Sequence, residues 1–102
     1  MPAQLYLRKK DQDLLLALLR VHLPGVSAWA YGSRVNGTAH DASDLDVALR
    51  ASNLEPINPS ALSDFQEALS QSNIPILVDV HDWSRLPKTF HSEITKNHIA
   101  LV

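Results

Sequence analysis

Apolar residues recur at helical spacing in three stretches of the chain, and these stretches predict three helices. The first covers residues 11–22, opens with acidic side chains and is stopped by Pro24 and the glycine after it. The second runs from 59 to about 71, because Asn58 is a suitable N-cap and the proline that follows fits the first helical position. The third covers about 87–96. Apolar positions of the two later helices are Leu62, Phe65, Leu69, Phe90 and Ile94.

Alternation of apolar and polar residues predicts three strands, at 26–32, 44–49 and 76–80. The apolar end of the chain, 99–102, is either a short edge strand or a surface for a partner. These elements predict one small α/β (α+β) domain over 1–102. We expect a two-layer fold, with a mixed or antiparallel sheet of at least three strands and helices on one face.

Composition narrows the class of protein. The 102 residues carry a formal net charge of −2, which gives no support for polynucleotide binding. The sequence has no cysteine, so thiolate metal sites and disulfides are excluded. No long apolar run predicts a leader or a membrane anchor. The expected location is therefore the cytoplasm.

Candidate chemistry is concentrated in two short motifs. Gly32-Ser33 ends the first predicted strand, and ten residues (34–43) separate it from Asp44-Leu45-Asp46. Carboxylates two positions apart on a strand project from the same face. A Gly-Ser turn lets the backbone approach phosphate closely and adds a hydroxyl group. Together with Asp79, the motifs predict a site for a magnesium nucleotide, with two metal ions ~4 Å apart and backbone N–H groups of segment 33–36 at the outer phosphates.

This interpretation constrains the layout of the sheet. Asp79 lies in an apolar run, so we expect it to be buried and to need a compensating partner. It is predicted near the end of the third strand, where it would join one metal ion or act as a base. For Gly32, Asp46 and Asp79 to meet at one rim, the second strand must run antiparallel to both neighbours.

Other side chains keep simpler interpretations beside functional ones. Arg34 either touches a phosphate or points into solvent. Trp29 and Tyr31 are expected to pack in the core rather than stack on a base. His81 shares the face of Asp79, but solvent exposure at the strand end is favoured. No pair at helical zinc-site spacing occurs among the five histidines, which are His22, His40, His81, His91 and His98.

The motifs also resemble those of a known family. Segments 29–37 and 43–47, together with 78–83, are similar to the motifs of minimal nucleotidyltransferases of the DNA polymerase β-like superfamily. The resemblance covers about 14–102 and implies a catalytic core without the extra helical domain of larger members. Carried over position by position, it implies phosphate contacts at Gly32 and Ser33, magnesium at Asp44 and Asp46, and Asp79 as the third acidic ligand.

The resemblance also implies a partner. Proteins of this kind are commonly encoded beside a helical HEPN-type protein and bind it, often as the antitoxin that modifies the toxin with AMP. The expected function is therefore magnesium-dependent transfer of AMP from ATP to a partner protein, in a hetero-oligomer or, without the partner, a homodimer. One alternative is a regulatory subunit that binds nucleotide and neutralises the HEPN-type protein without turnover. A weaker one is a small-molecule nucleotidyltransferase.

Overall fold

The computed structural model describes residues 5–37 and 43–102. Its elements, in chain order, are α1 (Lys9–His22), β1 (Ser27–Tyr31), α2 (Ser33–Asn36), β2 (Leu45–Arg50), α3 (Pro59–Ser70), β3 (Val78–Asp82), α4 (Lys88–Lys96) and β4 (Ile99–Ala100). Short 3₁₀ turns follow β2 at Ser52–Leu54 and β3 at Trp83–Arg85. All three predicted long helices are present. The apolar C-terminal segment forms an edge strand, which was one of its two predicted roles.

Local sequence signals explain where the helices begin and end. The side chain of Asn58 accepts hydrogen bonds from the backbone N–H groups of Ser60 (2.9 Å) and Ala61 (3.1 Å), with proline in the first turn. This confirms the predicted start of α3. Helix α1 begins at Lys9, two residues before the predicted start, and its last residue is His22, as predicted.

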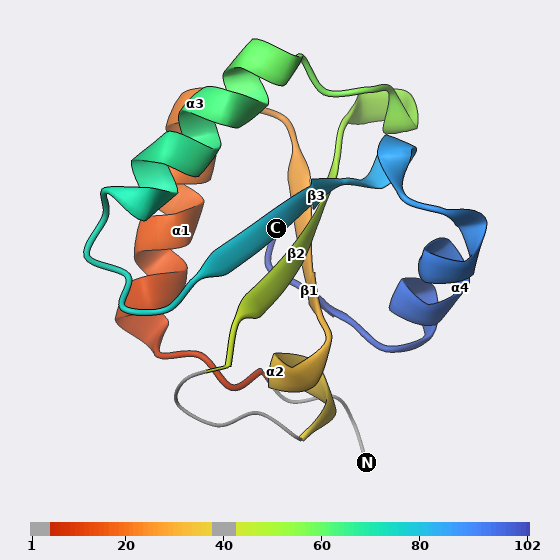
Figure 1. The fold of residues 1–102 in the computed structure, drawn as a ribbon, viewed down its shortest axis with the longest axis horizontal. Coiled ribbons are helices and arrows are strands. Elements are labelled where there is room, and N and C mark those ends of the chain that lie inside the picture. Colours follow the sequence, from red (N-terminus) through yellow and green to blue (C-terminus); the bar gives the residue numbers. More distant parts are fainter. Residues whose placement is uncertain (1–4, 38–42) are drawn as a thin grey trace.

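The four strands form one mixed sheet in the order β3-β2-β1-β4 (Figure 1). Strand β1 is antiparallel to both β2 and β4, whereas β2 and β3 are parallel. The mixed sheet is confirmed, but the prediction that β2 runs antiparallel to both neighbours is wrong. Helix α3 lies between β2 and β3 in the chain. It returns the chain to the end of the sheet at which β2 begins, so that β3 can run parallel to β2, and a helix is the usual connection between parallel strands.

Helices cover both faces of the sheet, so the expectation of helices on one face holds only for α1 and α3 (Figure 1). The face under α1 and α3 is closed by an apolar core that includes Leu15, Leu19, Val47, Phe65 and Val80. On the opposite face, Ile94 of α4 packs against Ala48 of β2 and Trp83. Beyond α4, toward the start of β2, no other helix of residues 5–37 and 43–102 covers that face.

The third strand is shifted by two residues from its predicted position. It begins at Val78 rather than Ile76 and continues to Asp82. Asp79 therefore lies near the beginning of β3, not near its end.

Among residues 5–37 and 43–102, no helix combines the length and apolar character that crossing a membrane would need.

Candidate active site

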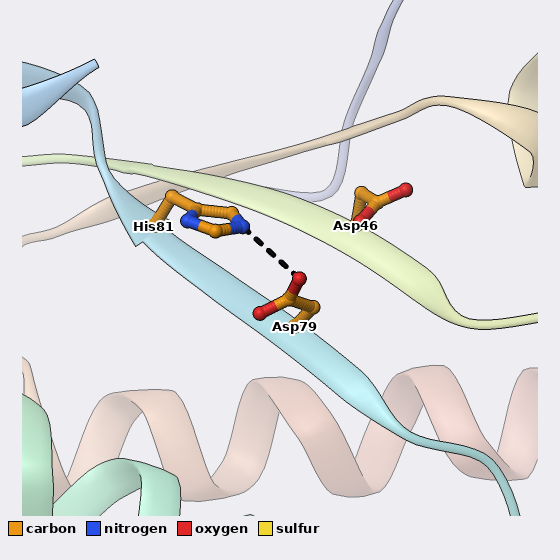
Figure 2. A group of neighbouring side chains, drawn as sticks. All are labelled: Asp46, Asp79 and His81. Atoms are coloured by element: carbon orange, nitrogen blue, oxygen red, sulfur yellow. Dashed lines mark ion pairs between the residues drawn. The ribbon is translucent and has the colours of Figure 1, made fainter.

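Strand register aligns three polar side chains across the uncovered face of the sheet. Tyr31 at the end of β1 pairs with Asp46 of β2, and Asp46 pairs in parallel register with Asp79 of β3. His81, two positions after Asp79, shares its face. Figure 2 shows Asp46, Asp79 and His81 together on one side of β2 and β3. The His81 Nε2 atom lies 3.2 Å from Asp79 Oδ2, and one ligand atom from each of the three residues lies within 4.8 Å of the others.

Gly32 makes room for this cluster. Its φ is +80°, a backbone conformation that favours glycine. A Cβ atom added there would lie 2.6 Å from Asp46 Oδ2, closer than any side chain tolerates. Two features therefore favour glycine here: the positive φ of the turn, and the Asp46 carboxylate, which any side chain at this position would displace. The backbone of the Gly-Ser turn consequently lies directly against the carboxylate of the Asp-x-Asp motif.

Arg34, in the short helix α2 after the turn, is buried and donates hydrogen bonds to two backbone carbonyl groups. It is 5 % exposed, and its guanidinium donates to the Ser43 carbonyl from Nε (3.0 Å) and Nη2 (2.8 Å) and to the Tyr6 carbonyl from Nη1 (2.7 Å). Arg34 therefore does not point into solvent. These contacts tie α2 to the segment that leads into β2, and so they position both motifs. A contact of Arg34 with phosphate stays a prediction.

The two remaining predicted carboxylates lie in different settings. Asp44 is exposed and immediately precedes β2, outside the Asp46–Asp79–His81 cluster. The Asp79 side chain is 51 % exposed, so the prediction that it is buried is wrong. Its neighbours in the chain are apolar because β3 alternates between a core face and an open face. Asp79 projects from the open face, where water and His81 compensate its charge.

Electrostatics favour a cation at the cluster. Burial raises the pKa of Asp46, and the nearby Asp79 carboxylate raises it further, while His81 lowers it and Asp44 adds a smaller increase. Burial also raises the pKa of Tyr31 to about 12, with contributions from Asp46 and Asp79. Tyr31 is therefore a neutral phenol at physiological pH. The cluster concentrates negative charge that a divalent ion would neutralise.

His81 lies on the face of Asp79, as alternation predicted, and its side chain is 38 % exposed there. Three other histidines stack or tilt against aromatic rings: His91 on Trp83 (4.0 Å between centroids), His98 on Trp29 (3.8 Å) and His22 near Phe65 (6.4 Å). Trp29 thus packs as expected. His40 lies outside the described residues.

Asp82 was missed altogether. It is 4 % exposed, and its carboxylate accepts hydrogen bonds from the Ile57 N–H group (2.9 Å) and from the N–H (3.0 Å) and hydroxyl (2.8 Å) of Ser84. Arg85 Nε lies 3.6 Å from the same carboxylate. Asp82 therefore fastens the loop before α3 to the end of β3. Its only sequence signal is an acidic residue on the apolar face of a strand.

Two aspartates paired across neighbouring strands, beside a glycine turn and a short helix on a mixed α/β fold, are typical of enzymes that transfer phosphate-containing groups. Comparison with known families is more specific. Residues 10–102 match the family model described as polymerase beta, nucleotidyltransferase, and the chain belongs to this family. It is accordingly a nucleotidyltransferase.

A curated relative supports this assignment, and two solved structures share the fold. The chain is 33 % identical over 99 residues to the probable protein adenylyltransferase MntA of Haemophilus influenzae, covering 97 % of this chain and 85 % of the relative. A crystal structure described as a toxin-antitoxin with AMP-PNP matches with a TM-score of 0.74 and 23 % identity. A crystal structure of a mutant of the toxin-antitoxin MntA-HpeT matches with a TM-score of 0.73 and 21 % identity. Each covers 89 % of this chain and 72 % of the matched one, and these two show a shared fold.

Proposed function

We propose that the protein is a magnesium-dependent adenylyltransferase that transfers AMP from ATP to a hydroxyl group of a partner protein. The observation that carries this proposal is the register of Asp46 with Asp79, directly beside Gly32. That arrangement places two carboxylates beside the backbone of the Gly-Ser turn. The adenylyl group and the protein acceptor are supported by the relative described as a probable protein adenylyltransferase.

The donor set fits the proposed metal. Carboxylate oxygens are the ligands that Mg²⁺ prefers, and Asp46 and Asp79 supply them within reach of one another. Asp44, at the entrance to β2, is the proposed third carboxylate, and His81 is an additional nitrogen donor at the rim of the cluster. When bound, magnesium would neutralise charge on the phosphates and on the attacking oxygen.

The protein's own residues would orient the substrate and move one proton. Gly32 and Ser33 would hold the outer phosphates with backbone N–H groups and the serine hydroxyl. A bond forms between the acceptor oxygen and the α-phosphorus while the bond from that phosphorus to the bridging oxygen breaks, and pyrophosphate leaves. The hydroxyl proton passes to Asp79. Because Asp79 is half exposed, it can return that proton to water.

A protein acceptor also agrees with what the fold leaves uncovered. Strand β3 is an edge of the sheet and carries Asp79, so a partner seated there would reach the cluster directly. Leu77, just before β3, is 63 % exposed. We propose a helical HEPN-type protein as this partner in a hetero-oligomer, which accords with the toxin-antitoxin descriptions of the two matched structures.

Calorimetry tests the nucleotide site. ATP should bind in the presence of magnesium and much more weakly without it, because the metal screens the phosphates from Asp46 and Asp79. Asp44→Asn and Asp46→Asn proteins should retain their fold and lose most of this metal-dependent affinity. Asp64→Asn, an exposed position on α3, is the matched control and should bind as the parent does. Unchanged binding by both motif variants would show that the site is placed wrongly.

Transfer is tested separately. The chain and its proposed HEPN-type partner are co-expressed, sized by light scattering, and incubated with ATP labelled at the α-phosphate. Label on the partner, abolished by Asp79→Asn, would support protein adenylylation. Metal-dependent ATP binding and complex formation without label would instead identify a regulatory subunit that does not turn over. A homodimer that ignores its neighbour would contradict the proposed partner.

A further inference from the structure

A cavity adjoins the Asp46–Asp79–His81 cluster on its β1 side. It has a volume of about 290 Å³ and lies between the end of β1 and helix α4, lined by Tyr31, Gly32, Phe90, Glu93, Ile94 and Asn97. Gly32 belongs to both sites, because the same residue lies against the Asp46 carboxylate. The cavity and the cluster therefore share Gly32 as a wall, and a molecule that occupies both sites would pass this residue.

Helix α4 presents one face to the cavity. Phe90, Glu93, Ile94 and Asn97 are spaced i, i+3, i+4 and i+7, which places them on the same side of the helix. Ile94 is 3 % exposed and anchors the helix to the sheet, whereas the Phe90 ring is left 50 % exposed. The cavity thus has an aromatic wall that no other part of the described chain covers.

Ring stacking and a hydrogen bond hold the helix in this position. The His91 ring stacks on Trp83 at 4.0 Å with an interplanar angle of 2°, and its Nε2 lies 2.7 Å from the Trp83 carbonyl oxygen. The ring of His98, just after α4, stacks on Trp29 at 3.8 Å. Both tryptophans belong to the sheet-side cluster that underlies α4. The cavity wall is therefore preformed and need not be ordered by its ligand.

The chemistry of the lining excludes phosphate and suits a base. None of the six lining residues is basic, and Glu93 would repel a phosphate group. Phe90 offers a face for stacking, and Ile94 an apolar floor. Glu93 accepts hydrogen bonds, while the Asn97 amide both donates and accepts them. An adenine presents an exocyclic amine beside a ring nitrogen, which complements this pair of side chains.

The geometry points to this cavity as the nucleobase subsite, with Phe90 stacking on the purine and Glu93 and Asn97 selecting adenine. This assignment rests on the proposed nucleotidyltransferase site, which it extends by one substrate contact. Guanine is disfavoured because its O6 would face the Glu93 carboxylate, where adenine has an amine. Phe90, Glu93 and Asn97 are thus specificity-determining residues for the reaction.

The test compares three probes in the presence of magnesium: ATP, GTP and inorganic tripolyphosphate, each titrated by calorimetry. Phe90→Ala should weaken the affinity for ATP about ten-fold, because a stacking partner is lost. The affinity for tripolyphosphate should stay unchanged. Glu93→Gln should reduce the preference for ATP over GTP, since an amide can donate to O6. Ser92→Ala, on the same helix but outside the cavity, is the matched control, and circular dichroism confirms that each variant is folded.

The outcomes separate this inference from the function on which it rests. Selective loss of ATP affinity in Phe90→Ala supports the base subsite. If the parent binds ATP with magnesium and Phe90→Ala binds it equally well, or loses tripolyphosphate to the same degree, the base lies elsewhere and the metal site stands. If Phe90→Ala keeps ATP affinity but no longer labels the partner, the cavity receives the acceptor and the assignment is overturned. A parent that binds neither probe overturns both proposals.

Discussion

The two faces of the sheet are built on different principles. The face under α1 and α3 is an apolar core in which Val47, Phe65 and Val80 are buried. The opposite face is covered by α4 only in part, through stacked aromatic and histidine rings, and leaves carboxylates open to water. Stability thus comes mainly from one face. The other face can carry side chains whose mutual repulsion would be costly inside a core.

Strand β3 shows the difference within five residues. Asp82 points to the core face and has hydrogen-bond donors from Ile57 and Ser84, so its charge is fully compensated within the protein. Asp79 points to the open face, where it forms an ion pair with His81. A carboxylate in the core must be satisfied by its own chain, whereas one at the site retains oxygens for a cation. Asp82 therefore serves the fold, whereas Asp79 is available to a ligand.

The largest expected effect comes from exchanging these two carboxylates for alanine. Asp82→Ala leaves the N–H groups of Ile57 and Ser84 without an acceptor, so the free energy of unfolding should fall by about 2 to 3 kcal/mol. Asp79→Ala should change it by about 0.5 kcal/mol or less, because the side chain is half exposed. Urea denaturation without metal measures both. Equal losses would mean that the two faces do not differ in this way.

A smaller effect is expected from two glycines with similar backbone angles. Gly25→Ala and Gly32→Ala share the strain of a positive φ, +83° and +80°, worth roughly 1 to 2 kcal/mol. Only Gly32→Ala also displaces Asp46 Oδ2, since no atom lies within 4 Å of a Cβ at Gly25. Both variants should melt earlier, but Gly32→Ala alone should weaken magnesium binding, by about ten-fold or more. If calorimetry finds the same magnesium affinity in both variants, the Gly32 turn does not contribute to the metal site.

The smallest effect concerns the pH dependence of Asp46. Its pKa is raised in the folded state, first by burial and then by Asp79, so its contribution to stability is complete below the ordinary aspartate pKa and is lost as pH rises through the folded value. At neutral pH, metal-free Asp46→Asn should therefore be more stable than the parent. The gain should stay below about 1 kcal/mol, since water screens this half-buried group.

Melting curves from acid to neutral pH check this sign. The gap between Asp46→Asn and the parent should close as pH falls toward the ordinary aspartate pKa. Magnesium should reverse the order at neutral pH, because it stabilises the protein that binds it. A variant that is less stable than the parent at neutral pH without metal would show that Asp46 is held mainly by attraction to His81.

Local sequence determined the elements and the motif residues. The N-cap at Asn58 and the Gly32 turn depend on neighbours a few positions away, so the chain specifies them without tertiary help. Period-two alternation likewise placed Asp46, and even His81, on the correct faces of their strands. The family resemblance rested on the same residues. These features can be predicted from the sequence because the interactions that determine them are made between residues close together in the chain.

Tertiary structure decided how the elements meet. The strand–helix–strand order from β2 to β3 favours a parallel pair, whereas the prediction that Gly32, Asp46 and Asp79 meet at one rim required an antiparallel pair. Register between distant strands then set Asp79 beside Asp46 on an open face, whereas its apolar neighbours had predicted burial. Helix α4 reached the second face through Ile94, Trp83 and Ala48, residues far apart in sequence. Such contacts are selected by the burial of the whole apolar surface, which depends on all the elements together and is not encoded in any one segment.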